Sequence, residues 1–426
     1  RLAALERRRV QEEYREVIER IAFLQDLLSS EDKIRAVVKE EILDLKRVYG
    51  DPRRTRVRDL DVSTDVSAQD LVFNADVVLA CSASGWVKRY PASVYHAGPG
   101  GLTEDLSAAG APVLAVLRTN AQHKVAFVTQ RGRAFALGAH QIPDLGQQPD
   151  GVTLGSLARL EDGEQVVALV SMDEADEEHA IALATAEGRV KRLTLAELNS
   201  VNRDVTTVFG LDGEDMLVGA VPADAQSEIM LVTAQGRVIR FAADDVRPQG
   251  LPATGMKGID LKAGDRVVAI DAVQDNAELL IVSENGFGKR SSLREYSAQG
   301  RGGQGMLTLD TSKTAIAGAL VGACVVEPGD QVLLGVSNGS LVQCVVDDIP
   351  RARRDNWGRI VTRTRSGAVV SVGDDEQVVS CIALRFSDGE ASGGSPGPVP
   401  SPEEDGKPVA TRTRRPRAKP ASTVEQ

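Results

Sequence analysis

A hairpin-like pattern occurs six times along this chain of 426 residues. Each copy has an apolar strand, a short turn that contains glycine, and a second strand that in most copies carries Lys or Arg. The turns recur roughly every 50 residues, a period typical of solenoids and propellers. Their glycines are Gly85, Gly132, Gly188, Gly236, Gly286 and Gly339.

A second type of apolar stretch runs between the copies. Examples are the segments 163–170, 264–273 and 375–384, which alternate or cluster Val, Ile and Leu. Each unit therefore supplies about four strands. Six such units predict a mainly β, six-bladed, propeller-like disc, which closes on itself and leaves no long exposed sheet edge. No unit matches the Trp-Asp or kelch signatures.

The two ends of the chain differ from this repeat. Residues 1–58 carry apolar residues at helical spacing, with an interruption at Ser29-Ser30 and a stop signal at Gly50-Asp51-Pro52. They predict a helical coiled-coil arm; an amphipathic helix packed on an absent domain is the alternative. Residues 388–426 are rich in Gly, Ser and Pro and then in Arg, which predicts a disordered basic tail. The domain between them is expected to span 59–387.

Composition limits the possible surroundings and sites. No apolar run is long enough for a membrane helix, and the chain begins without Met or a secretory signal. We expect a cytoplasmic fragment of a longer protein. The four cysteines lack Cys-x-x-Cys spacing and the four histidines lack metal-ligand spacing. We therefore expect free buried thiols and no metal site.

The net charge of -11 argues against a nucleic-acid partner, because Lys and Arg supply most of the affinity for phosphate. The charges are unevenly distributed, however. Segment 161–178 holds eight acids and no base, whereas segment 351–365 holds six arginines and one acid. An acidic body with basic stripes is compatible with DNA binding.

Two passages resemble the A subunit of bacterial type IIA DNA topoisomerases, gyrase or topoisomerase IV. One is the N-terminal RLAALERRRVQEEYREVIERIAFLQDLL with its continuation VVKEEILDLKRVYGDPRRTRV, which is similar to the coiled-coil arm that follows the dimerising gate. The other, RVIRFAADDVRPQGLPATGMKGIDLKAGDRVV from Arg237, is similar to the fourth blade. With the six repeats, the resemblance covers nearly all of residues 1–386.

The resemblance implies a six-bladed β-pinwheel, whose blades exchange strands and whose rim DNA curls around. It implies an enzyme that is an ATP-dependent isomerase, in which two A subunits dimerise and join two ATPase B subunits. Neither magnesium, in the cleavage core, nor ATP, on the B subunit, is expected to bind this chain. The family's nucleophilic tyrosine lies in an Arg-Tyr-Thr context; the only comparable string here is Arg89-Tyr90-Pro91, so no catalytic residue is assigned.

Basic residues at one end of each hairpin form the main candidate DNA site. Because strand residues two apart point the same way, their repetition around a disc predicts a ring of cations for a curved phosphate backbone. Ordinary solvated strand positions are the alternative interpretation. The set comprises Lys88, Arg89, Arg131, Arg133, Arg189, Lys191, Arg192, Arg237, Arg240, Lys289 and Arg290, with Arg351, Arg353, Arg354 and Arg359 near the sixth hairpin, which lacks cations of its own.

A Gly-rich loop is the second candidate. Gyrases carry a Gln-Arg-Arg-Gly-Gly-Lys-Gly box after the first hairpin, where this chain has the segment 94–101 without Gln or Arg. A related string follows the fifth hairpin instead. Missing side chains would let its backbone N–H groups approach a phosphate. The residues assigned to this contact are Gln299, Arg301, Gly302, Gly303 and Gly305.

The leading hypothesis is a DNA-binding and DNA-bending part of a gyrase-like enzyme, which presents a segment for strand passage. The altered first-blade box leaves open a topoisomerase IV subunit that relaxes and decatenates. A propeller scaffold that binds proteins is the alternative from another class. An independent enzyme is disfavoured, because no nucleophile, base or metal cluster emerges from the sequence.

Overall fold

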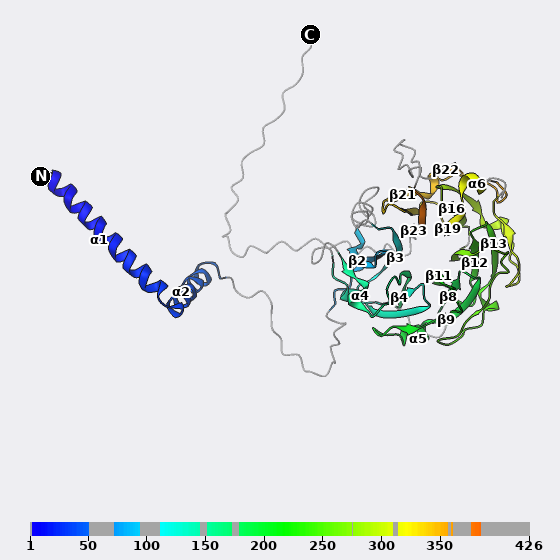
Figure 1. Cartoon of the computed structure of the whole chain (residues 1–426), viewed down its shortest axis with the longest axis horizontal. Coiled ribbons are helices and arrows are strands. Elements are labelled where there is room, and N and C mark those ends of the chain that lie inside the picture. The colour runs from blue at the N-terminus through cyan, green and yellow to red at the C-terminus, as the bar shows by residue number, and fades with distance from the viewer. Residues whose placement is uncertain are drawn as a thin grey trace, which may run out of the picture. The chain divides into compact units, whose positions relative to one another are not determined.

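The computed structural model describes residues 2–50, 72–93, 111–144, 151–172, 179–274, 276–309, 314–356, 359–360 and 376–384. The chain divides into two compact units, Arg1–Ser67 and Ala68–Gln426 (Figure 1). The predicted tail and the first-blade segment 94–101 lie outside the described residues.

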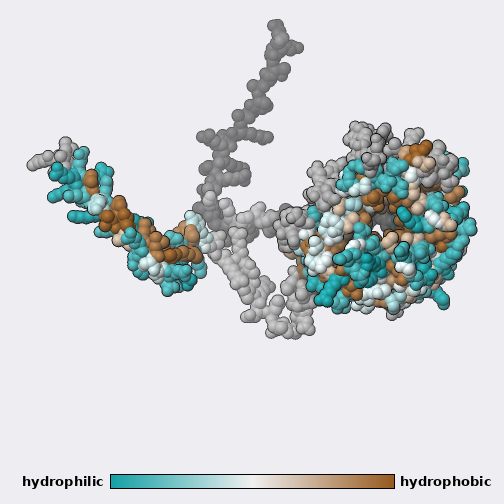
Figure 2. Space-filling view, viewed as in Figure 1, coloured by the Kyte–Doolittle hydropathy of each residue, from teal (hydrophilic) through white to brown (hydrophobic). Residues whose placement is uncertain are grey.

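Two helices form the described part of the first unit, α1 (Leu2–Leu28) and α2 (Glu31–Tyr49). The break falls at Ser29 and Ser30, as the sequence predicts. Acids begin α2 and bases end it, an arrangement that complements the helix dipole. Apolar side chains such as Ile18 and Ile42 are exposed along both helices. Figure 2 shows brown, hydrophobic patches on this unit. The pairing of these side chains in a coiled coil stays a prediction.

The second unit consists of six antiparallel sheets, arranged as the blades of a ring (Figure 1). Each blade is built on a hairpin whose turn glycine has a positive φ, from 70° to 87°. The first hairpin strands are β1 (Asp76–Ser82), β4 (Lys124–Thr129), β8 (Ala180–Thr185), β12 (Glu228–Thr233), β16 (Glu278–Ser283) and β20 (Gln331–Val336). The second hairpin strands are β2 (Trp86–Pro91), β5 (Arg133–Gly138), β9 (Arg189–Thr194), β13 (Arg237–Ala242), β17 (Phe287–Ser292) and β21 (Leu341–Val345).

An inner strand pairs with the first strand of every hairpin. These strands are β3 (Val113–Asn120), β7 (Val166–Met172), β11 (Leu217–Pro222), β15 (Val267–Ala272), β19 (Leu320–Val326) and β23 (Val378–Leu384). Together they line an axial cavity of about 390 Å³. The six-bladed, mainly β prediction is confirmed.

Short outer strands complete the first five blades, and the next repeat donates each of them. They are β6 (Val152–Thr153), β10 (Thr206–Thr207), β14 (Met256–Lys257), β18 (Met306–Leu307) and β22 (Arg359–Ile360). For example, β14 follows the fourth hairpin in sequence but pairs with β9 of the third blade. This exchange is the pinwheel arrangement that the resemblance implies. In the sixth blade the structure describes three strands.

Short helical turns connect these strands. Most follow a hairpin and lead into the loop before an outer strand, which we call the outer loop. The turns are η2 (Ala139–Gln141), α4 (Leu154–Leu157), α5 (Leu195–Asn199), η3 (Ala243–Asp245), η4 (Leu293–Glu295), α6 (Thr314–Ala317) and η6 (Val346–Asp348).

The apolar cores lie between neighbouring blades. Val78 and Val113 of the first blade pack in one cluster with Leu333 and Leu384 of the sixth, which closes the ring. The Ser380 hydroxyl also donates to the Val113 carbonyl across this junction, at 2.8 Å. Burial of branched side chains of this kind stabilises by about 1.5 to 3 kcal/mol each, so the blades support one another.

Candidate nucleic-acid interface

The third residue after the turn glycine is buried in every blade. It is lysine in the odd blades, Lys88, Lys191 and Lys289, and Phe135, Ile239 or Val342 in the even ones. Lys191 and Lys289 have exposed fractions of 0%. The prediction that these lysines face outward in a ring of cations is wrong, because the position belongs to the core.

Backbone carbonyls on or beside the outer loops surround the two fully buried ammonium groups. Lys191 Nζ donates to the Val208 and Gly250 carbonyls, both at 2.8 Å. Lys289 Nζ donates to three carbonyls of the loop before β22, among them Arg354 at 2.6 Å. Burial lowers the pKa of both lysines to about 8, partly opposed by a nearby glutamate. These two ammonium groups hold the loops in place through hydrogen bonds, and they are not available to bind a ligand.

Lys88 occupies the same position in the first blade. Its Nζ lies 5.0 Å from the centre of the Trp86 ring, within the range of a cation–π contact. Its exposed fraction is 6%, so its ammonium is also largely withdrawn from the surface.

In four blades the fourth residue after the glycine is an arginine that links its blade to the next one. Arg89, Arg192 and Arg290 lie 3.6, 3.6 and 3.4 Å from the carboxylates of Asp144, Asp244 and Asp347, which follow the next hairpin. Arg240 instead donates to the Leu293 and Tyr296 carbonyls, at 3.1 and 3.3 Å, and pairs with Glu228. Glu278 adds a second pair to Arg290 at 3.0 Å. Acid partners thus offset the charges expected to face phosphate.

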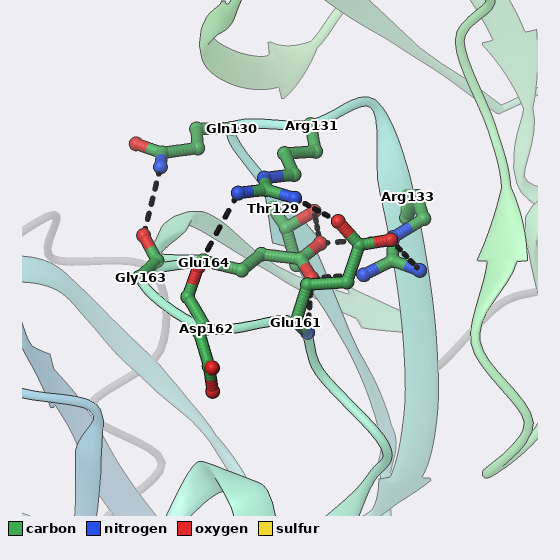
Figure 3. Close-up of polar contacts among 8 residues, drawn as sticks. All are labelled: Thr129, Gln130, Arg131, Arg133, Glu161, Asp162, Gly163 and Glu164. Atoms are coloured by element: carbon green, nitrogen blue, oxygen red, sulfur yellow. Dashed lines mark hydrogen bonds and ion pairs between the residues drawn. The ribbon is translucent and has the colours of Figure 1, made fainter.

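The second blade shows the same neutralisation at its turn (Figure 3). Arg131 pairs with Glu161, and Arg133 pairs with both Glu161 and the buried Glu164. Glu164 also accepts a hydrogen bond from the Thr129 hydroxyl at 2.6 Å. These arginines brace the turn that begins the inner strand.

Arg189 and Arg237, one residue after the glycine, are only partly buried. Arg189 donates to the Thr254 and Gly255 carbonyls at 2.7 and 3.0 Å, and Arg237 donates to the Gln304 carbonyl at 2.9 Å. Because carbonyl groups are neutral, these partners do not offset the positive charges of Arg189 and Arg237 beside the donated strands.

The Gly-rich loop packs on the third and fourth blades through its own backbone N–H and C=O groups. The Gln299 amide donates to the Arg240 carbonyl at 2.7 Å, and the Gly302 amide donates to the Gly258 carbonyl at 2.8 Å. Those two N–H groups are therefore not aimed at a phosphate. The Gly303 carbonyl accepts from Asp260, again at 2.8 Å.

Close contact with the receiving strand explains the last glycine of this loop. Gly305 has a φ of 64°, and a Cβ there would lie 2.6 Å from the Val238 carbonyl oxygen. Gly255 has the same role beside Val190 in the third blade, with a φ of 67° and a distance of 2.7 Å. Gly255 and Gly305 thus allow the donated strand to pair closely with the receiving strand, and this role does not depend on any ligand of the loop.

Arg301 and Arg354 occupy equivalent places in the fifth and sixth repeats. Arg301 Nη1 donates to the Lys257 carbonyl at 2.5 Å, and Arg354 Nη1 donates to the Leu307 carbonyl. Each therefore reaches the outer strand of a neighbouring blade, and each keeps its charge. The outer loops of three blades are linked in this way along the edge.

Four further cations on or beside the outer loops were not predicted from the sequence. Arg203, Arg247, Lys257 and Arg294 are exposed. Arg351 and Arg353 are also exposed, at 65% and 79%, although they pair with Glu278 and Asp355. Arg359 lies in β22, and its side chain is outside the described residues. We call this set the outer-loop cations: Arg203, Arg247, Lys257, Arg294, Arg301, Arg351, Arg353 and Arg354.

The signal that could have found them is their location. Most of them lie in the loop before a two-residue outer strand, at comparable places in successive repeats, whereas Lys257 lies in the outer strand β14 and Arg294 in the turn η4. Within the described residues no group of His, Cys, Asp and Glu could hold a metal ion. The helices that the structure describes include none with the length and apolarity to span a membrane.

Comparison with known proteins agrees with this geometry. The family described as the DNA gyrase C-terminal domain, beta-propeller, matches residues 123–171, 179–224, 227–274 and 277–314, the second to fifth repeats. The DNA gyrase A subunit of Clostridium acetobutylicum is 33% identical over 393 residues, which are 92% of this chain and 46% of that protein. The DNA gyrase A subunit of Staphylococcus aureus is 30% identical over 402 residues, 92% of this chain and 43% of that protein.

The chain belongs to the DNA gyrase A-subunit family. It spans about half the length of the curated relatives it matches. Solved C-terminal domains of DNA topoisomerase IV and DNA gyrase A share its fold, with TM-scores of 0.59 each and identities of 21% and 22%. They cover 74% and 73% of this chain and 94% and 100% of their own lengths.

The Arg89-Tyr90-Pro91 string is the one compared above with the context of the family's nucleophilic tyrosine. Tyr90 has an exposed fraction of 0% and packs in the core between the first and sixth blades. A tyrosine buried in this way cannot attack a DNA phosphate, so the string has a packing role.

Proposed function

We propose that this chain binds duplex DNA along the outer edge of the pinwheel and bends it, as part of a gyrase-like type IIA topoisomerase. One observation carries the proposal. Six of the eight outer-loop cations are exposed around the edge and the other two, Arg301 and Arg354, are partly buried, whereas most hairpin cations are buried or paired with acids. Figure 2 shows hydrophilic side chains over this edge.

Contacts of this kind suit bending without sequence selection. They touch phosphates, which position the duplex but carry no base information. Smooth bending of a 20 to 30 base-pair site costs on the order of 1 to 6 kcal/mol. Several charge contacts with counterion release can offset that cost.

The cations become denser toward the end of the pinwheel. The third and fourth outer loops contribute Arg203 and Arg247, whereas the sixth contributes Arg351, Arg353 and Arg354. We therefore place the strongest DNA contact at the fifth and sixth repeats.

The remaining parts of the reaction belong to other regions of the whole enzyme. Its A subunits would dimerise and join two ATPase B subunits, and ATP and magnesium would bind outside this chain. The bent segment would be presented for strand passage, with the enzyme in the cytoplasm and associated with the nucleoid.

A binding assay tests the proposal and separates it from a protein-binding scaffold. The chain should retain plasmid and short duplexes of unrelated sequence on a filter at low salt. The slope of log affinity against log salt should be steep, since each neutralised phosphate contributes roughly -0.9. A slope near zero would favour the scaffold.

A topoisomerase IV subunit is the second candidate, because segment 94–101 lacks the Gln and Arg of the gyrase box. The fold does not separate the two, since both C-terminal domains match with the same TM-score. Supercoiling of relaxed plasmid by the full-length enzyme with ATP would indicate gyrase. Relaxation and decatenation alone would indicate topoisomerase IV.

A further inference from the structure

Two cysteine thiols meet where the fifth blade contacts the sixth. Cys324 on β19 and Cys381 on β23 place their Sγ atoms 3.7 Å apart. Both are reduced, and both line the axial cavity. We propose that Cys324 and Cys381 are an oxidation site, at which a peroxide forms a reversible disulfide that joins the sixth blade to the fifth.

The backbone permits this close approach because β19 has a glycine beside Cys381. A Cβ built on Gly322 would lie 2.7 Å from the Cβ of Cys381, closer than real Cβ contacts come. Only a residue without a side chain therefore lets the two inner strands approach this closely. A disulfide requires about 2.05 Å between its sulfur atoms, and rotation of two short side chains can close the remaining gap.

The other two cysteines serve as internal controls. Burial, with a smaller contribution from the neighbouring Cys381, raises the pKa of the Cys344 thiol to about 12, and burial also raises the pKa of the Cys81 thiol. The thiolate is the reactive form of cysteine, so neither residue is activated at neutral pH. Cys381 is partly exposed toward the cavity, which gives a small oxidant access to its sulfur.

The reaction balances with a peroxide as the oxidant. The Cys381 thiolate attacks one peroxide oxygen, the O–O bond breaks, and Cys381 becomes a sulfenic acid as hydroxide leaves and takes up a proton. The Cys324 sulfur then displaces the hydroxyl group as water, and the S–S bond forms. Two electrons pass from the thiols to the peroxide, and two molecules of water result.

The bond would strengthen the junction between the fifth and sixth blades. In the sixth blade the structure describes three strands, against four in each of the others. A link between positions 324 and 381 encloses β20 and β21 of that blade in one covalent loop. Long loops of this kind restrict the unfolded chain most.

Peptide mapping of the 426-residue chain tests the proposal directly. The chain is treated with hydrogen peroxide, blocked with N-ethylmaleimide, and digested without reductant. Trypsin leaves Cys324 and Cys344 together on peptide 314–351, so a second cleavage, before aspartates, separates them at Asp330. We expect peptide 314–329 joined to the Cys381 peptide that ends at Arg385. Absence of a link, or a link through Cys344, would overturn the proposal.

A stability measurement adds an independent readout. Oxidation should raise the Tm by about 5 °C, and dithiothreitol should reverse the rise. Cys344→Ser should behave as the parent does, whereas Cys324→Ser and Cys381→Ser should show no rise. An equal rise in Cys381→Ser would also overturn the proposal, and the mapping of the parent chain does not depend on any variant folding.

Discussion

Lys and Arg occur both in the hairpins and in the outer loops, but most of them are buried or paired with acids in the hairpins and exposed in the outer loops. In the hairpins, Lys289 is enclosed by three carbonyls and Arg290 bridges to Asp347 of the next blade. In the outer loops, Arg247 and Arg353 lie at the surface. A hairpin strand is covered by a donated strand and by the neighbouring blade, so its cations are drawn into the structure. An outer loop has no further layer over it, and its cations stay accessible.

The largest expected effect follows from removing the densest outer-loop charge. Replacing Arg351, Arg353 and Arg354 with Ala should weaken duplex binding at low salt by roughly 100-fold, since a hydrogen bond to a charged group contributes about 1.5 to 3 kcal/mol and two of these arginines are partly paired. The measurement is a titration of the variant with a labelled duplex. Unchanged affinity in a folded variant would move the interface away from the sixth repeat.

Removal of a buried hairpin lysine should act on stability instead. Lys289→Met leaves three loop carbonyls without their donor, so the free energy of unfolding should fall by about 3 kcal/mol. The matched control, Lys257→Met, changes an exposed lysine and should alter stability by less than about 0.5 kcal/mol. Denaturant unfolding measures both, and similar losses would show that exposure does not separate the two classes.

The same lysine should make stability depend on pH. Burial lowers the pKa of Lys289 from 10.5 to about 8, so between these values the unfolded chain binds more protons than the folded one. Stability should therefore rise with pH across this window, by comparison with Lys289→Met, which lacks the group. Unfolding of both proteins at pH 8 and at about pH 10 measures the difference. A constant difference would contradict the burial of an ionised amine.

A single outer-loop charge should have the smallest effect. Arg301→Ala should weaken DNA binding roughly fivefold and reduce bending. Lys88→Ala removes the same charge from a buried position and should change folding more than bending. Energy transfer between dyes at the ends of a short duplex, at saturating protein, reports bending. If Lys88→Ala straightens the duplex more, the Gly-rich loop is only a turn.

Much of the fold could be predicted because it follows from local chemistry. The turn glycines require a positive φ, and Val- and Leu-rich stretches on either side of each turn form the buried strands. Ser29 and Ser30 likewise mark the helix break. The cation positions were harder to predict. Alternation along one strand shows that Lys191 and Arg189 share a face, but it does not show that the Val208 and Gly250 carbonyls will enclose Lys191.

Strand donation is a contact between residues far apart in the chain, so one hairpin read alone gives no sign of it. The structural role of the loop glycines was not predicted, for the same reason. Gly305 is needed because Val238 of the receiving strand lies against it, and that neighbour is distant in sequence.

The salt dependence of DNA binding tests most directly whether the outer loops, rather than the hairpins, contact DNA. The double variant Arg203→Ala, Arg247→Ala removes two exposed outer-loop charges, and Arg131→Ala, Arg290→Ala removes two hairpin charges that are paired with acids. We predict that the log-log slope becomes shallower by roughly 1.8 in the first variant and stays unchanged in the second. An equal change in both, or a change in the second alone, would contradict the account.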